Sequence, residues 1–158
     1  MPEHVVPVDL IAGWDPNAPH AVMISADSGT TVLALDAHQD DADQRCVVLV
    51  WTGVASASMS APNDEAISGH RLYDKGLDDV RWVGVVRESE LVADLERRSR
   101  AQPGHTPARY ERLVHHVVLL KECTVEVVAE LLSRDRIAGP TAAAAAQALP
   151  ISPAEPAG

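Results

Sequence analysis

The hydrophobic positions of this chain fall mainly in short runs with the two-residue alternation of β-strands. Residues 20–36 contain two such runs around Asp27, Ser28 and Gly29, which predicts a β-hairpin that turns at these three residues. Residues 45–53 are apolar on both faces, a pattern typical of a central strand that is covered on two sides. Residues 79–89 alternate again and predict a further strand.

Helical patterns occur only in the second half of the chain. Ser89 can cap a helix over residues 89–101, whose apolar positions share one face. Thr106, followed by a proline, can cap a short second helix. Residues 113–131 then predict two strands that meet near Lys121 and Glu122, although the second arm could equally begin as a helix.

Strands joined by hairpins, with helices inserted late, favour an α+β fold. We expect an antiparallel sheet or partial barrel, with one or two helices inserted before a C-terminal hairpin. Residues 1–138 are interpreted as a single domain. Residues 139–158 are rich in Ala and Pro, so we expect a tail that is flexible or lies on the surface and contributes little to the core.

The charge of the chain is uneven. The formal net charge is −10, and residues 1–80 carry thirteen acidic residues against three basic ones. An acidic half repels phosphate backbones, so nucleic acid is not an expected partner. The Ala-, Val- and Arg-rich usage without Phe is typical of a GC-rich bacterial genome, such as that of an actinomycete.

Sorting signals and cofactor motifs are not found in the sequence. The N-terminus has no basic segment followed by a long apolar core, and no apolar run is long enough to span a membrane. Cys46 and Cys123 lack the spacing of a paired motif, so we expect two free thiols in a cytoplasmic protein, with a single disulfide between them as the open alternative. GxGxxG, P-loop, GxSxG and HExxH motifs are missing, so no cofactor is predicted.

Residues 60–77, SAPNDEAISGHRLYDKGL, form the most polar segment between two apolar runs. Asn63 and Asp64 can cap a short helical turn. Capping does not require Glu65, His70 or Tyr73. A carboxylate beside an imidazole can make a general base and a tyrosine can donate to an oxyanion, so these three are the candidate catalytic residues.

His115 and His116 are adjacent on a predicted strand and must face opposite sides of the sheet. We expect one to face the core or a pocket and the other to face solvent or a neighbour. Together with Asn63 and Asp64 they are the candidate ligand-binding residues. A divalent metal would require His70, one of these two histidines and a carboxylate such as Asp64 or Glu65, and the spacing leaves that site open.

Three segments together resemble a family of small uncharacterised bacterial proteins. The segments are PNDEAISGHRLYDKGL, SELVADLERRSR and RYERLVHHVVLLKECTVEVVAE. They are similar to the pattern PNDEAxxGHxLYxxGL, then SxxIxxLExxN, then a His-rich strand before a turn and a second strand. The resemblance covers residues 62–130 and departs at Ser99, where the family pattern has Asn. It implies that these segments belong to one fold and implies no reaction.

Three functions follow from these residues. The first is a ligand-binding or protein-interaction module with residues 60–77 as its site. The second is a cofactor-independent isomerase, cyclase or hydrolase that uses Glu65 or His70 as a general base. The third is a divalent-metal-binding protein that uses His70 with His115 or His116. The expected partners are a small-molecule ligand or a protein, with no nucleic acid and no membrane, and a homodimer is left open.

Overall fold

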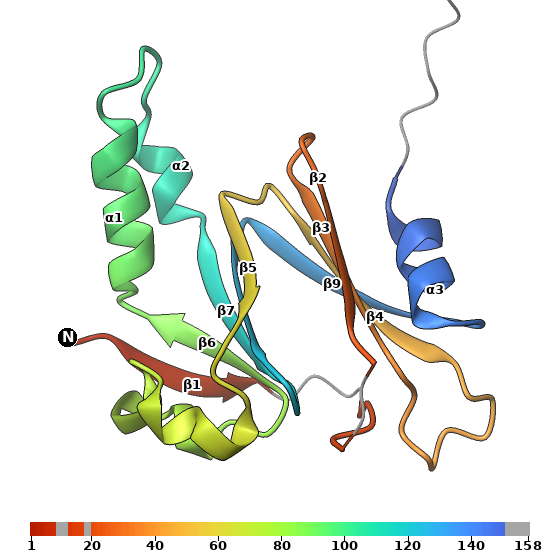
Figure 1. Ribbon diagram of the computed structural model, residues 1–158. Coiled ribbons are helices and arrows are strands. Elements are labelled where there is room, and N and C mark those ends of the chain that lie inside the picture. Colours follow the sequence, from red (N-terminus) through yellow and green to blue (C-terminus); the bar gives the residue numbers. More distant parts are fainter. Residues whose placement is uncertain (9–12, 18–19, 151–158) are drawn as a thin grey trace, which may run out of the picture.

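The computed structural model describes residues 1–8, 13–17 and 20–150, which form an α+β fold on two antiparallel sheets (Figure 1). The strands are β1 (His4–Val8), β2 (Val22–Ala26), β3 (Thr30–Leu35), β4 (Cys46–Thr52), β5 (Ser56–Ser60), β6 (Val83–Arg87), β7 (Val114–Leu119), β8 (Thr124–Ala129) and β9 (Leu131–Ile137). The helices are α1 (Glu90–Ser99), α2 (Pro107–Glu111) and α3 (Thr141–Ala148), with three 3₁₀ helices, η1 (Asp64–Gly69), η2 (Tyr73–Lys75) and η3 (Leu77–Asp79).

The two sheets pack against each other around one apolar core. Their strand orders are β1-β6-β7-β8-β5 and β2-β3-β4-β9, and every pairing is antiparallel. The main core cluster joins Leu33 and Leu49 of the four-stranded sheet to Val118 and Val127 of the five-stranded sheet. The described strands form two separate sheets, which agrees with the expected α+β class and antiparallel pairing.

The predicted hairpin and central strand are confirmed. β2 and β3 pair from Ala26↔Thr30 onward, and Gly29 takes the left-handed φ of 84° that the turn requires. β4 lies between β3 and β9, and its Val48 is fully buried. Both faces of β4 are covered because the five-stranded sheet packs on one side and α3 on the other.

The outer face of the five-stranded sheet is covered by two different structures. Residues 64–79 lie over one part of it, where Leu72 and Leu77 are fully buried against Val86 and Val117. α1 and α2 lie together beside β7 at the other end (Figure 1). The segment that contains Leu72 and Leu77 approaches the sheet closely at Gly84, where an added Cβ would lie 2.8 Å from Cγ2 of Val80. Polar side chains lie between these two covers and contact one another, and we call them the polar seam: Glu3, His70, Arg71, His115 and Glu126.

The C-terminal segment contains a helix where a flexible or surface-lying tail was expected. Residues 141–148 form α3, which packs on β2, β3 and β4 (Figure 1). Ala144 and Ala145 are fully buried against Val32 and Val48, so the expectation that residues 139–158 add little to the core is wrong for this helix. Short alanine side chains let the helix approach the sheet closely, and that packing outweighs the nearby prolines. The part of the predicted tail at 151–158 lies outside the described residues.

The two adjacent histidines also differ from expectation. His115 and His116 do face opposite sides of β7, but both are buried. The expectation that one of them faces solvent or a neighbour is wrong, because this sheet is covered on both faces at that point.

No described helix is long and apolar enough to cross a membrane.

Candidate functional site

The residues predicted from the 60–77 segment separate in space. Asn63 caps η1 by accepting a hydrogen bond from the Ala66 N–H at 3.2 Å, as expected. Asp64 pairs with Lys121 at 2.8 Å on the surface. Glu65 is exposed on the same side, and Tyr73 is half-buried in η2. Among the described residues, the hydrogen bonds and ion pairs of the His70 ring involve neither Glu65 nor Tyr73.

His70 instead meets a carboxylate that the sequence analysis did not single out, that of Glu126 on β8. His70 Nε2 lies 3.4 Å from Glu126 Oε1, and the imidazole is almost completely buried. The Leu72 N–H donates to His70 Nδ1 at 3.2 Å, so the proton of the neutral ring belongs on Nε2, facing Glu126. Burial lowers the pKa of His70 more than the charge of Glu126 raises it, so the ring is neutral at physiological pH.

Glu126 is the centre of the polar seam. Besides His70, its Oε2 is 2.6 Å from Arg71 Nη2 and 2.8 Å from His115 Nε2. The His115 contact lies off the axis of an aligned hydrogen bond. Burial alone raises the pKa of Glu126, but His115 and the charge of Arg71 outweigh it and hold the pKa below its usual value. Glu126 is therefore an ionised carboxylate facing three donors.

His115 connects this carboxylate to Ser89, the N-cap residue of α1. The Ser89 Oγ accepts a hydrogen bond from the Val92 N–H at 3.2 Å and lies 2.8 Å from His115 Nδ1. Ser89, His115 and Glu126 come from the start of a helix and from two adjacent strands. They form a continuous array, here called the Ser89 array.

Glu3 anchors the N-terminal strand beside this array. Its carboxylate is 1% exposed and accepts from Lys75 Nζ at 2.7 Å and from the Glu90 N–H at 2.9 Å, with Arg71 at 3.3 Å. Burial alone raises the pKa of Glu3, but these donors hold it below its usual value. The buried Glu3 and the half-buried Glu126 thus face two cations, Arg71 and Lys75, so the seam is balanced in charge.

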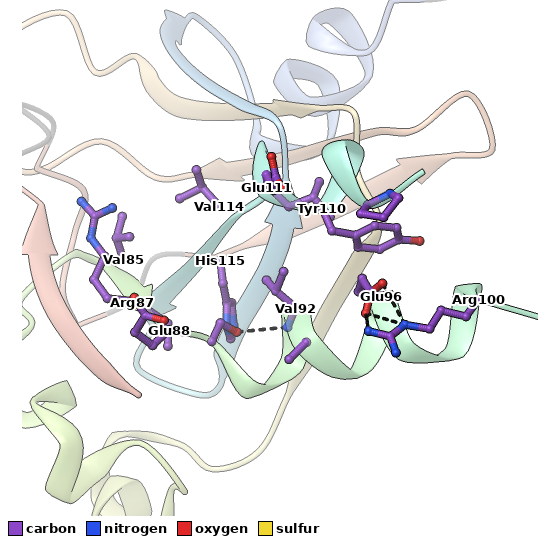
Figure 2. Close-up of a pocket in the computed structure, with 15 residues that line it drawn as sticks. Val85, Arg87, Glu88, Val92, Glu96, Arg100, Tyr110, Glu111, Val114 and His115 are labelled. Carbon is purple, nitrogen blue, oxygen red and sulfur yellow. Dashed lines mark hydrogen bonds and ion pairs between the residues drawn. The ribbon is translucent and has the colours of Figure 1, made fainter. Parts of the chain in front are cut away.

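A cavity of about 620 Å³ opens between α1, α2 and the ends of β6 and β7, and we call it the α1–α2 cavity. It is lined by residues 85–89, by Val92, Ala93, Glu96 and Arg100 of α1, by Pro107, Tyr110 and Glu111 of α2, and by residues 113–115. Figure 2 shows Val92 between His115 and the Glu96–Arg100 pair, with Tyr110 and Glu111 across the cavity. Ser89 is half-buried in the wall of this space, and the side chain of His115 lies behind it, completely covered.

A second array of the same residue types lies along α1. Ser99 Oγ is 2.8 Å from His105 Nδ1, and His105 Nε2 is 3.1 Å from Glu96 Oε1. The Ser99 hydroxyl also donates to the Glu96 carbonyl at 2.8 Å. A hydrogen bond from Arg100 holds the pKa of Glu96 below its usual value. We call these three residues the Ser99 array.

His116 belongs to the core between the sheets. Its ring lies 6.3 Å, centroid to centroid, from that of Trp51, and its Nδ1 has no hydrogen-bond partner in the described part of the chain. Burial, helped by the nearby His115, lowers the pKa of His116 to about 4. This histidine is neutral at physiological pH and does not reach the α1–α2 cavity.

The metal alternative receives no geometric support. Within residues 1–8, 13–17 and 20–150, no group of three or more His, Cys, Asp or Glu side chains is arranged to hold a metal ion. His70, His115 and Glu126 do converge, but Arg71 occupies the same carboxylate oxygen as His115. A guanidinium at that position repels a divalent cation.

Glu126, Ser89 and Glu3 were missed as site residues. One signal could have found Glu126. It is the single acid in an apolar strand, and the predicted turn near Lys121 and Glu122 places it opposite Val117, on the face of His115. Ser89 was recognised only as a helix cap. No local pattern marks Glu3, because its partners lie far away in the sequence.

No protein-family model, curated protein or solved structure gives a significant match to the chain. The geometry of the site is therefore the basis for any function assigned to it.

Proposed function

We propose that this protein binds a small, mainly apolar molecule with one hydrogen-bonding group in the α1–α2 cavity. The observation that carries the proposal is the position of Ser89, which contacts the buried His115, in the wall of a cavity of about 620 Å³. This volume lies within the range of small-molecule sites, which are mostly apolar with a few fixed polar groups. The proposal keeps the ligand-binding function expected from the sequence but moves the site from residues 60–77 to α1 and α2.

The lining carries two arginines and three glutamates, a mixed set of charges that favours no strongly charged ligand. Valines, a leucine and Tyr110 supply the apolar wall. Arg100 is engaged by Glu96 through contacts of 2.7 and 3.0 Å, so its charge is already compensated. His115 is held in place from behind by Glu126. Arg87, Glu88 and Glu111 are exposed residues of the lining, whereas Ser89 is half-buried and, with His115 behind it, can accept or donate one hydrogen bond to a ligand.

The test uses two small neutral amides, benzamide and butyramide, and amide NMR shifts of the labelled full chain. We expect saturable shifts at Val92, Ala93, Tyr110 and His115. Ala93→Trp should abolish them, because the indole would fill the cavity from its α1 side. Arg97→Trp places the same side chain on an exposed position of α1 outside the lining and should leave them unchanged.

Binding that survives Ala93→Trp, or shifts centred elsewhere, would contradict the proposal. Failure of both probes to bind up to their solubility limits would also contradict it. Far-UV circular dichroism of both tryptophan variants checks that α1 is intact.

A further inference from the structure

The turn from β6 into α1 holds Ser89 in a defined position. Glu88 takes a left-handed φ of 50°, which is uncommon for a residue with a side chain, and the chain then enters α1 at Ser89. The Ser89 oxygen already accepts the Val92 N–H. Its hydroxyl proton is therefore free to be donated, and His115 Nδ1 at 2.8 Å is the acceptor within reach.

The direction of hydrogen bonding in the Ser89 array follows from Glu126. If His115 Nδ1 carried the proton, the lone pair of Nε2 would face an ionised carboxylate oxygen at 2.8 Å, which is repulsive. The favourable arrangement has Ser89 O–H donating to Nδ1 and Nε2–H facing Glu126. This is the polarity that activates a serine, with a base that accepts its proton and an anion that stabilises the resulting imidazolium.

We propose that Ser89 is a nucleophile that accepts the acyl group of small neutral esters bound in the α1–α2 cavity. This proposal rests on the proposed function, because the cavity must first hold the ester. Ser89 is the catalytic nucleophile, His115 is the general base and acid, and Glu126 is a positioning residue that acts through His115.

The steps balance without any further reactant except water. Ser89 Oγ attacks the ester carbonyl carbon while its proton passes to His115 Nδ1. The tetrahedral intermediate collapses, the bond from carbon to the alcohol oxygen breaks, and the leaving alkoxide takes the proton from Nδ1. Water then attacks the acyl-serine with His115 again as base. The products are the free alcohol and the carboxylic acid, and the Ser89 hydroxyl is restored.

The intermediate oxyanion would be stabilised by the N-terminus of α1. In that first turn, the N–H of Glu90 is bound by Glu3 and the N–H of Val92 by Ser89. The N–H of Leu91 is the one that these two side chains do not engage. A site with one oxyanion donor instead of two is slower by a factor on the order of 100. We therefore expect slow turnover and a detectable acyl-enzyme.

The experiment incubates the full chain at neutral pH with p-nitrophenyl acetate or p-nitrophenyl butyrate. Release of p-nitrophenolate is followed by absorbance, and acid-quenched samples are analysed by intact mass and peptide mapping. We expect one acyl group per chain, located on Ser89. His115→Gln should slow acylation at least about 100-fold, as expected for the loss of a general base.

The matched variants separate chemistry from helix capping. Ser89→Asn keeps a good N-cap residue but removes the nucleophile, so it should abolish the adduct while α1 stays folded. Ser89→Asp serves the same purpose if Asn disturbs the helix. Ser99→Asn changes the serine of the Ser99 array and should leave acylation of Ser89 unchanged.

Acylation confined to lysines, cysteines or the N-terminus, or an unchanged adduct in Ser89→Asn, would overturn the proposal. Amide binding in the α1–α2 cavity without acylation of Ser89 would overturn this proposal alone and leave the proposed function standing. Loss of both amide binding and acylation would overturn both.

Discussion

The Ser89 array and the Ser99 array contain the same three residue types at similar distances, but they differ in what surrounds them. Ser89, His115 and Glu126 come from a helix cap and two strands, and the His115 side chain is completely buried. Ser99, His105 and Glu96 come from one helix and the loop that follows it, and Arg100 shares the same carboxylate. Distance alone therefore does not distinguish a reactive serine from a structural one.

The difference between the arrays lies in the direction of hydrogen bonding. The Ser89 oxygen accepts from a backbone N–H, which leaves its proton for His115. The Ser99 hydroxyl donates to a backbone carbonyl, so it must accept from His105 Nδ1, and because His105 Nε2 faces the Glu96 carboxylate at 3.1 Å, both ring nitrogens are donors there. A serine that has given its proton to the backbone cannot transfer it to a histidine, and the Ser99 array is accordingly a helix-end clamp.

The largest expected difference is in stability after loss of the carboxylate. Glu126→Gln removes the anion that faces two covered imidazoles and one of the two carboxylates that contact Arg71, and should cost up to roughly 3 kcal/mol in the free energy of unfolding. Glu96→Gln should cost much less, because the partners of Glu96 are Arg100 and His105, which are more exposed to solvent than the partners of Glu126. Urea denaturation of both variants measures the difference, and equal losses would show that the two carboxylates are equivalent.

His116 lies outside both arrays, and its contribution to the pH dependence of stability must be known before the pH dependences of the two arrays are compared. The pKa of His116 is 6.5 in the unfolded chain and about 4 in the folded chain. Between these values the unfolded state holds more protons, so stability falls as pH falls, by about 3 kcal/mol in total. Urea denaturation across this range should show the loss, and His116→Leu should reduce it. An unchanged pH profile in His116→Leu would contradict the assigned burial.

A smaller difference is expected between the two serines. Ser89→Ala removes the N-cap of α1 and the acceptor of the Val92 N–H, and should cost about 1 kcal/mol in unfolding free energy. Ser99→Ala removes a hydroxyl at the last residue of the same helix and should cost less. Thermal unfolding of both variants provides the comparison, and a larger loss for Ser99→Ala would reverse the ranking.

Local patterns were sufficient for much of the fold. Turn chemistry at Asp27 to Gly29 and the cap at Ser89 correctly predicted a hairpin and α1, because these features depend on neighbouring residues. β1, β5 and β9 are edge strands with short or polar sequences, and they form because each pairs with a more buried neighbouring strand. Likewise, α3 was underestimated because docking on the sheet, rather than helix propensity, stabilises it.

The candidate site was predictable only in part. His70 and His115 were singled out, and they do lie on one carboxylate, but that carboxylate is Glu126 rather than Glu65. A loop residue such as Glu65 can point to solvent at no cost, whereas an acid on an apolar strand must find partners. The role of these residues in binding or catalysis stays a prediction.

The direction of the hydrogen bonds is tested most directly by the protonation of the two imidazoles. Nitrogen-15 NMR of histidine-labelled protein at neutral pH, assigned with His115→Gln and His105→Gln, reports which ring nitrogen carries hydrogen. We predict that Nδ1 of His115 carries no hydrogen and accepts from Ser89, and that Nδ1 of His105 carries hydrogen and donates to Ser99. Hydrogen on Nδ1 of His115 would contradict the account, because Ser89 would then be an acceptor like Ser99.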